Sequence, residues 1–509
     1  MPLDNIPQEV VEHIAYYAAT RAVLGPPAGI IPLLLANRKI HALLSFASNP
    51  HLYARIFQQK FDPTVTRLDA DVGALADELR RRCTYLRRIK ERAACTVDPI
   101  LRPRKADQDL LHEILWMSLL MTLENAGKNE EQLRTYARID GWLRLFWFDD
   151  AGASLTNPAK RERWPLNNEF TSLAMWLFWF FLRPEDYASD SISHGKATDL
   201  VKLIALGAHQ YHLSAPYSAD FQPDPTVLHG VLVTHYARTY RLIPPPITAP
   251  AVLCYLSLIN CRKNARAAQL MFSRGQKDEW GPVWARCLGL SEANSGREVG
   301  AAFELGSLNG IWEGIFTYTE FTAYAALLSG APPLVLLNSL VAQHRHTWKL
   351  REYHFTSAYP ISRSSSGSAR SDCAASPISP GDPLRGFLPE GARMEENQEE
   401  GIVEVWERGK DVPLVYRSAA EGEGRVRDVL IVGEGHSSWG QFNLLGRIRP
   451  WDGFICLSKE YVDGDRGKWL YRGYLLGNAE GHIAGRWRDT LSPPNVPGYE
   501  GCFAMSRRR

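Results

Sequence analysis

Three short segments of the 509-residue chain contain residue types that can do chemistry, and each lacks a part that the chemistry needs. Residues 433–438 (GEGHSS) begin like a dinucleotide-binding loop but lack its third glycine, and they also fail the GxSxG pattern. Asp463 and Asp465 resemble the start of a calcium loop that has no glutamate at its twelfth position. His209 and His212 have the spacing of metal ligands without an evident third ligand. We therefore expect no enzymatic activity, no metal site and no cofactor.

The composition is that of an ordinary globular protein, with 45% apolar and 22% charged residues. At about 150 residues per domain, the length predicts two to four domains. The formal net charge of +2 is far from the basic excess of nucleic-acid binders, so we expect no nucleic-acid partner. The eight cysteines are scattered and form no CxxC pair, which indicates free thiols in a reducing compartment.

Two apolar runs are interpreted as buried helices and not as membrane spans. Residues 173–182 supply about half of the roughly 20 residues that a bilayer requires, and residues 323–342 are interrupted by Gly330 and Pro332-Pro333. The N-terminus has neither the basic region nor the long apolar run of a signal peptide. We expect a soluble protein without a membrane partner, in the cytoplasm or nucleus.

The first sixty residues predict three short helices. Pro7 opens a pattern with apolar residues at three- and four-residue spacing, and the glycines and prolines of residues 25–29 end it. A second helical pattern follows over residues 33–47, and Asn49-Pro50 is a strong start for a third helix. Three helices of this size bury too little apolar surface to be stable alone. The module should therefore lean on the next domain or on a partner.

The residues of this module follow a characteristic order. They are Ile6-Pro7-x-Glu9-Val10-x-x-x-Ile14, then residues 33–40 (LLLANRKI), then Asn49-Pro50-x-Leu52-Tyr53. This order resembles an F-box, in the variant of the large fungal families with a longer first loop. F-box modules dock on the Skp adaptor, which tethers them to a cullin–RING ligase. By position, the resemblance implies that the adaptor-facing or supporting residues are Ile6, Pro7, Val10, Ile14, Leu33, Leu34 and Leu52.

The module departs from the family at Asn37 and Ile40, where cysteine and tryptophan are usual. The alternative to an F-box is a structural three-helix cap whose leucine and isoleucine residues all pack inward.

Residues 63–300 keep a helical period and predict a helical scaffold domain. The basic run at residues 80–92 (RRRCTYLRRIKER) shares a segment with Leu75, Leu79 and Leu86, which predicts a helix with a solvated basic face. Other helices are expected at residues 108–125, 131–148, 168–182, 197–214, 226–242, 250–259, 264–273 and 332–346.

Beyond residue 300 the apolar period changes to two, which is typical of β-strands. The pattern aromatic–acid–Gly–apolar–apolar recurs at Trp312, Trp451 and Tyr499, and glycine beside large aromatics suits a tightly curved sheet. Strands are expected at residues 310–318, 350–360, 401–407, 413–417, 427–433, 440–448, 453–461, 468–476, 482–488 and 499–506. Because Trp312 shares the repeat, the apolar helix at 332–346 should be an insertion between strands.

The predicted fold class is therefore α+β multidomain. It has an N-terminal three-helix F-box (residues 1–62), a helical middle domain (63–300) and a C-terminal antiparallel β-barrel (301–509). Residues 361–401 are rich in Ser, Pro, Gly and Glu and are predicted to be a disordered insertion.

An F-box followed by helices and a barrel loosely resembles F-box proteins whose barrel captures degron peptides. This implies that the barrel mouth binds a target through aromatic and a few polar groups. Candidates are Trp439, Trp451, Trp469, Arg486 and Trp487, with barrel filling by Trp and an outward, solvated Arg486 as the alternative.

The leading hypothesis is a non-enzymatic substrate-recognition subunit of an SCF-type cullin–RING ubiquitin ligase. Its partners would be the Skp adaptor and an unknown protein target. The second hypothesis is a ligand-binding β-barrel protein with a purely structural helical N-terminus. A third is an enzyme that uses the barrel interior.

Overall fold

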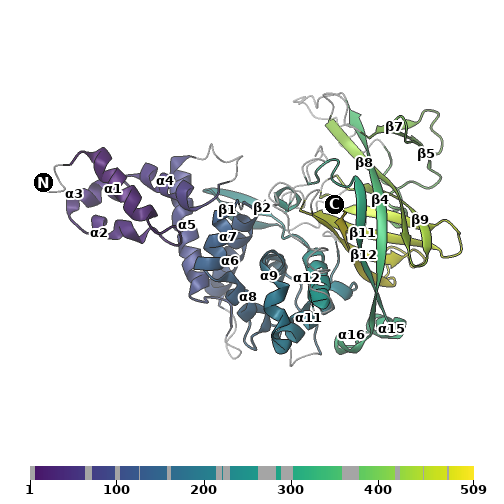
Figure 1. Ribbon diagram of the computed structural model, residues 1–509, viewed down its shortest axis with the longest axis horizontal. Helices are drawn as coiled ribbons and strands as arrows, with labels where there is room; N and C mark the ends of the chain where they lie inside the picture. The colour runs from purple at the N-terminus through teal and green to yellow at the C-terminus, as the bar shows by residue number, and fades with distance from the viewer. Residues whose placement is uncertain are drawn as a thin grey trace. The chain divides into compact units, whose positions relative to one another are not determined.

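The computed structural model divides the chain into two compact units (Figure 1). The first unit contains residues 1–157, 176–182 and 231–241, and the second contains residues 158–175, 183–230 and 242–509. The structure describes residues 6–63, 71–97, 104–124, 126–156, 162–213, 221, 230–261, 283–287, 302–357, 378–418, 425–450, 452–477 and 481–508.

Residues 6–63 of the first unit form four short helices and one 3-10 turn, and asparagine side chains cap the last two helices. They are α1 (Gln8–Thr20), the 3-10 turn η2 (Ala28–Ile30), α2 (Ile31–Leu34), α3 (Arg38–Leu44) and α4 (Pro50–Lys60). The Asn49 side chain accepts a hydrogen bond from the Leu52 amide at 3.0 Å, which confirms the predicted start of α4. The predicted helix over residues 33–47 is wrong as one helix. Asn37 is extended and caps a new helix by accepting from the Ile40 amide at 2.8 Å.

Longer helices and one hairpin complete the first unit. They are α5 (Val72–Lys90), α6 (Lys105–Leu123), α7 (Lys128–Glu131), the π-turn η4 (Gln132–Tyr136), α8 (Ile139–Phe148), the end of α9 (Glu169–Phe181), β1 (Val231–His235) and β2 (Arg238–Leu242). The helix predicted over residues 226–242 is wrong. Tyr236 and Ala237 take φ values of 47° and 59°, so the chain turns back as a two-residue hairpin.

In the second unit, helices pack on one another and on the sheet. They are α10 (Pro184–Ala188), α11 (Ser191–Leu206), α12 (Thr248–Cys261), α15 (Phe321–Leu328) and α16 (Leu334–Asn338). Helix α12 packs against α11 and against the last two strands of the sheet. Most of α12 is buried because its sequence is apolar on every side. The helix predicted at 264–273 lies outside the described residues.

The strands of the second unit form a closed antiparallel barrel. They are β3 (Gly310–Thr319), β4 (Val341–Ser357), β5 (Arg393–Asn397), β6 (Ile402–Trp406), β7 (Leu414–Arg417), β8 (Arg425–Ser437), β9 (Gly440–Ile448), β10 (Ile455–Tyr461), β11 (Lys468–Leu476), β12 (His482–Asp489) and β13 (Glu500–Arg507). Eight of them, in the order β3-β13-β12-β11-β10-β9-β8-β4, close through pairing of β3 with β4. The predicted barrel is confirmed.

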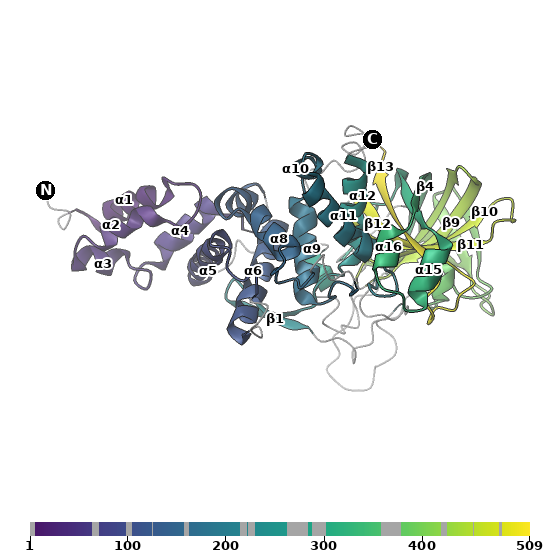
Figure 2. The same cartoon turned by 90° about the horizontal axis from the view of Figure 1, so that it is seen from below.

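The insertion between the first two barrel strands is also confirmed, because α15 and α16 separate β3 from β4. These helices lie side by side at one end of the barrel (Figures 1 and 2). The helix predicted over 332–346 is too long, since β4 begins at Val341. The residues from Val341 to Leu350 instead satisfy their backbone groups by pairing with β3.

Strand β4 extends beyond the barrel and carries a small second sheet region. Its last residues pair with β7 at His354 and Arg417, and β6 and β5 follow outward. A separate core lies there, formed by Tyr353, Ile378, Leu388, Val403, Val405, Tyr416 and Leu430. The predicted disordered insertion at 361–401 is therefore wrong for residues 378–401, because these residues supply apolar side chains to that core. Residues 361–377 lie outside the described part.

Glycines let neighbouring strands approach closely in the barrel. A Cβ built on Gly314 of β3 would lie 2.0 Å from the Ala504 carbonyl oxygen of β13. Gly314 and Gly501 belong to two copies of the aromatic–acid–Gly repeat, and these copies lie on adjacent strands. The aromatic residues of the repeat fill the interior instead, where Trp312, Phe316 and Phe503 belong to one core. An eight-stranded barrel is just wide enough to be filled by side chains in this way.

Replacing Gly314 by alanine should destabilise the second unit by about 1–3 kcal/mol, because backbone must move to admit the methyl group. Gly195 in α11 is the matched control, since a Cβ there meets nothing within 4 Å. Gly195→Ala should stabilise by up to about 1 kcal/mol through helix propensity. Urea unfolding of the full chain measures both. Equal effects of the two substitutions would contradict the tight packing of β3 on β13.

Candidate functional site

Helix α1 carries two apolar stripes, one buried and one exposed. Val11, Ala15 and Ala19 recur every four residues and are buried in the module. Val10 and Ile14 recur at the same spacing on another face and are 46% and 40% exposed, and Tyr17 is 67% exposed. Val10 and Ile14 thus keep a large part of their area exposed, and contiguous exposed apolar area is a feature of interaction surfaces.

The predicted adaptor-facing residues divide into three groups by burial. Pro7, Val10 and Ile14 are exposed, and Ile6, Leu33 and Leu34 are half-buried. Leu52 is buried in α4 and supports the module from inside. Exposed Ile31 and Leu35, which the sequence analysis missed, flank α2. We call the exposed residues Val10, Ile14, Tyr17, Ile31 and Leu35 the N-terminal apolar surface.

Buried polar contacts attach the N-terminal helices to the rest of the first unit. The Lys60 ammonium donates to the carbonyl oxygens of Ala22 at 2.5 Å and of Gly25 at 3.2 Å. The Gln132 side chain accepts from the Gly25 amide at 2.7 Å and donates to the Lys60 carbonyl oxygen at 3.3 Å. Gly25 is needed here because its φ is +75° and because a Cβ would collide with the Tyr136 ring. The long first loop is thus held in one conformation.

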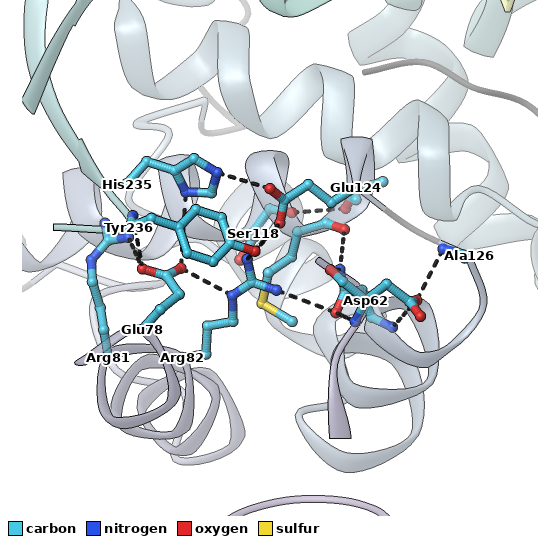
Figure 3. A network of polar contacts seen from close by, with 12 residues as sticks. Asp62, Glu78, Arg81, Arg82, Ser118, Glu124, Ala126, His235 and Tyr236 are labelled. Atoms are coloured by element: carbon cyan, nitrogen blue, oxygen red, sulfur yellow. Dashed lines mark hydrogen bonds and ion pairs between the residues drawn. The ribbon is translucent and has the colours of Figure 1, made fainter. Parts of the chain in front are cut away.

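A second attachment joins the end of α4 to α7. The Asp62 carboxylate accepts from the backbone amides of Ala126 at 2.9 Å and Asn129 at 3.1 Å (Figure 3). The Asn129 side chain is fully buried and accepts in turn from the Asp62 amide at 3.1 Å. These reciprocal bonds fix the chain where the N-terminal module ends.

Beside this attachment, one fully buried guanidinium joins several elements of the first unit (Figure 3). Arg82 of α5 donates to the carboxylates of Glu78 at 3.0 Å and of Glu124 at 2.5 Å. Glu124 also contacts the His235 ring nitrogen at 2.9 Å, and the Tyr236 hydroxyl lies 3.2 Å from Arg82. The Phe57 ring centroid lies 5.0 Å from the guanidinium carbon, within the range of a cation–π contact. Helices α4, α5 and α6 and the hairpin therefore meet at this group.

Charge compensation decides the ionisation of this cluster. Burial alone would raise the pKa of Glu78, but the charges of Arg82, His235 and Arg81 outweigh burial and hold that pKa below its usual value. Burial would likewise lower the pKa of Arg82, but its acidic neighbours hold that pKa above the ordinary value. Both groups are charged at neutral pH.

The prediction that the basic residues of α5 are solvated is wrong for Arg82, which is fully buried. A signal was present in the sequence, because Arg82 continues the spacing of Leu75, Leu79 and Leu86 along the apolar edge. A charged residue on an apolar stripe requires buried partners, and Glu78 one turn earlier is the first of them.

Replacing Arg82 by methionine should destabilise the first unit by about 3–5 kcal/mol, because the buried carboxylates lose their counter-charge. Arg88→Met on the same helix is the control, since the Arg88–Glu91 ion pair is exposed and the change should stay within about 0.5 kcal/mol. Thermal unfolding followed by circular dichroism distinguishes the two. An Arg82→Met protein as stable as Arg88→Met would refute the central role of this cluster.

The predicted target-binding residues of the barrel do not form one site. Trp487 belongs to the interior core, Trp439 and Trp469 are partly buried and pack against that core, and the Trp469 and Trp487 rings lie 5.4 Å apart. Arg486 points to the outer face because adjacent residues of β12 alternate. Arg486 is therefore outward, as the alternative expected, but it is buried, so the expected solvation is wrong. Trp451 lies outside the described residues.

The aromatic end of the barrel is partly open to solvent. Tyr318, Trp439 and Trp469 are half-buried there, whereas Trp487 is 1% exposed and donates from Nε1 to the Thr317 carbonyl oxygen at 3.0 Å. The opposite end is closed by residues 303–308, which belong to the same core and contact β3 and β4. We call the aromatic end the barrel mouth.

A lysine that was not among the predicted site residues is buried inside the barrel. Lys459 is 2% exposed, and its ammonium lies 3.0 Å from the Tyr461 hydroxyl and 3.5 Å from His346 Nε2. The Phe442 ring centroid is 4.1 Å from the same nitrogen. Within the described ranges, Lys459 forms no salt bridge with a carboxylate. Strand alternation was the available signal, because Lys459 shares a face with Leu457 and Tyr461.

Burial changes the protonation of this pair. It lowers the pKa of Lys459 to about 7, so the amine is partly neutral at physiological pH. Burial, followed by the charge of Lys459, lowers the pKa of His346 to about 2. His346 Nδ1 is buried and has no hydrogen-bond partner among the described residues. The barrel interior therefore contains an uncompensated amine beside a neutral imidazole.

The Lys459 amine should make the stability of the second unit depend on pH. Its folded pKa of about 7 lies below the unfolded value of about 10.4, so the unfolded chain binds more protons between these values. The free energy of unfolding should thus rise with pH across that window and be lowest below it. Lys459→Met should remove the rise and stabilise the protein near neutral pH by about 1–4 kcal/mol.

Lys468→Met is the control for this substitution, because Lys468 is about half exposed and pairs with Glu460 on the barrel surface. Urea unfolding near pH 7 and near pH 9, followed by tryptophan fluorescence, gives the measurement. The same pH dependence in wild type and Lys459→Met would show that this amine is not the titrating group.

Comparison of the chain with protein-family models, curated proteins and solved structures finds no match. In the described ranges, no helix has both the length and the apolar character that crossing a bilayer requires. The same residues contain no group of three His, Cys, Asp or Glu side chains that could hold a metal ion. The N-terminal apolar surface and the polar side chains inside the barrel are candidate functional features.

Proposed function

We propose that this chain is a non-enzymatic substrate-recognition adaptor of an SCF-type cullin–RING ubiquitin ligase, with residues 1–62 as an F-box that docks on the Skp adaptor. The observation that carries the proposal is the exposed stripe of α1, where Val10 and Ile14 stand at positions implied by the F-box order. If the module were only a structural cap, these side chains would pack inward as Val11 and Ala15 do. Such an adaptor would act in the cytoplasm or nucleus.

The two departures from the F-box order have structural uses in this chain. Asn37 caps α3, and Ile40 is 1% exposed and packs inside the module. Asn37 is half-buried and Ile40 is buried, so both offer a partner less accessible surface than an exposed side chain would. Adaptor binding would therefore depend on α1 and on the exposed Ile31 and Leu35 at the two ends of α2.

The attachments of the N-terminal module support a docking role. Lys60 and Gln132 hold the first loop, and Asp62 holds the end of α4. The module therefore does not rely on its exposed stripe for its position. A rigid module keeps its docking surface in one conformation, which lowers the entropy cost of binding an adaptor.

The barrel would bind the protein target in this proposal. Trp439 and Trp469 at the barrel mouth are half-buried, so their rings offer apolar contact area at a solvent-accessible edge. Aromatic rings with a few polar groups are typical of recognition surfaces. Trp487 is buried behind them and would act by supporting Trp469.

A second function, a ligand-binding barrel, is favoured by one observation. Lys459 and His346 place polar groups inside the barrel, and the Trp348 Nε1 group is buried there without a partner in the described part of the chain. Buried polar groups without partners are costly, and a ligand would satisfy them.

The adaptor proposal predicts that the purified full-length chain binds a purified Skp adaptor. Ile14→Asp should weaken this binding at least tenfold, since a carboxylate cannot be buried against an apolar partner without cost. The combination with Pro7→Ala should weaken it further. Val462→Asp is the control, because Val462 is an exposed apolar residue of the barrel domain and should leave binding unchanged. Biolayer interferometry gives the dissociation constants.

Two outcomes of this experiment would overturn the adaptor proposal. One is an absence of binding by the folded wild-type chain, and the other is undiminished binding by the Ile14→Asp, Pro7→Ala variant. Native mass spectrometry of the same preparation distinguishes the second function. A retained small ligand without adaptor binding would favour the ligand-binding barrel.

A further inference from the structure

A small pocket lies on the outer face of the barrel, remote from the interior core. It measures about 60 Å³, and its polar lining consists of His209, His212, Arg472, Arg486, Arg488 and Glu500. Strand register explains why these residues gather, since Arg472 of β11 is paired with Arg486 of β12, and Arg488 of β12 with Glu500 of β13. Residues 208–213, which follow α11, and residues 494–497 supply other walls.

The pocket has an excess of positive charge. Glu500 is the single carboxylate of its lining, and it forms an ion pair with Arg472 at 3.1 Å. Arg486 and Arg488 are 1% and 2% exposed, and neither forms a salt bridge among the described residues. Two buried guanidinium charges are therefore left without an ion-pair partner at this pocket.

Backbone carbonyl oxygens partly satisfy the two unpaired arginines. Arg486 donates to the carbonyl oxygens of Ile204, Ala205 and Tyr211, and so attaches the end of α11 to the barrel. Arg488 donates to carbonyl oxygens of the loop that follows β12. These bonds satisfy donors, but carbonyl groups are neutral and leave the positive charge in place.

Two further atoms at the pocket have no partner. Arg472 Nε and His209 Nδ1 are buried and form no hydrogen bond within the part of the chain that the structure describes. Both histidines are neutral near pH 7, because burial and then the charge of Arg486 lower the pKa of His209 and bring that of His212 to about 4. His209 can therefore carry its single ring proton on Nδ1 and donate it.

We propose that this pocket binds a small oxyanion, either a phosphate or a carboxylate group. An oxyanion supplies the missing negative charge, and its oxygens accept from Arg472 Nε and His209 Nδ1. The small volume admits one such group and not a drug-sized molecule. The ligand is a free ion or the charged end of a larger molecule that enters beside residues 494–497. This proposal does not depend on the adaptor role.

Calorimetric titration of the full-length chain tests the proposal, with inorganic phosphate in one arm and acetate in the other. Sodium chloride of equal ionic strength controls for screening of surface charge. Saturable binding of phosphate, of acetate or of both supports the site and identifies which oxyanion it prefers. Heats no larger than those of sodium chloride in both arms overturn the proposal.

Arg472→Gln should weaken oxyanion binding tenfold or more, because it removes one positive charge and the unpartnered Nε donor. Arg466→Gln is the matched control, since Arg466 carries the same charge on an exposed turn before β11 and should bind as wild type does. Wild-type affinity in a folded Arg472→Gln protein would overturn the proposal.

His209→Phe provides a second test that leaves the charge unchanged. It keeps the ring, which packs edge-on against Trp164 at 5.0 Å, and removes the Nδ1 donor. Binding should weaken about threefold to tenfold. If Arg472→Gln fails to fold, His209→Phe is the deciding variant. An oxyanion affinity of His209→Phe equal to that of wild type would then overturn the proposal.

Discussion

Pairing of β3 with β4 is the constraint on which the second unit depends. It closes eight strands into a barrel, and closure assigns every side chain of those strands either to the interior or to the outside. Trp487 and its neighbour Arg486 show the consequence, because one enters the core and the other faces α11. A shift of one residue would exchange them and would bury the arginines of the outer pocket in the aromatic core.

Closure also explains why the interior tolerates a lysine. The interior is filled with aromatic rings, and Gly314 adds no side chain between Trp312 and Phe316. Where the rings of Phe442 and Tyr461 stand close together, their faces surround the Lys459 ammonium and partly replace its lost hydration. The rings do not fully replace the water that the ammonium loses on burial, and this loss of hydration lowers the pKa of Lys459.

Much of the fold could be predicted from the sequence, because local periodicity and overall packing agree over most of the chain. Each expected strand of the barrel domain overlaps an observed one, and the internal repeat placed β3 in the barrel despite the helices that follow it. The errors arose where tertiary contacts outweighed local pattern. Residues 231–242 form a hairpin, because a turn at Tyr236 places His235 against Glu124. Residues 378–401 are ordered because they pack into a second core beside the part of β4 that extends beyond the barrel.

The candidate sites were less predictable, since each depends on residues distant in the sequence. The predicted target-binding set failed to account for alternation in β12, which separates Arg486 from the three interior tryptophans. Lys459 and Arg82 were both visible as charges on an apolar face, but their partners come from other elements, namely His346 of β4 for the lysine and Glu124 after α6 for the arginine. Periodicity identifies such a residue as buried, whereas only the fold identifies what it meets.

The N-terminal module shows how a small helical unit can keep an apolar surface free. A module of about sixty residues normally needs all of its apolar side chains for its own core. Here Lys60, Asp62 and Gln132 supply buried hydrogen bonds to the following helices, and the Arg82 cluster holds those helices together beneath Phe57. Because these bonds add to the buried core of Leu44, Ile56 and Phe57, the module keeps its position while Val10 and Ile14 stay exposed. The same attachments that fix the module thus leave Val10, Ile14 and Tyr17 of α1 exposed.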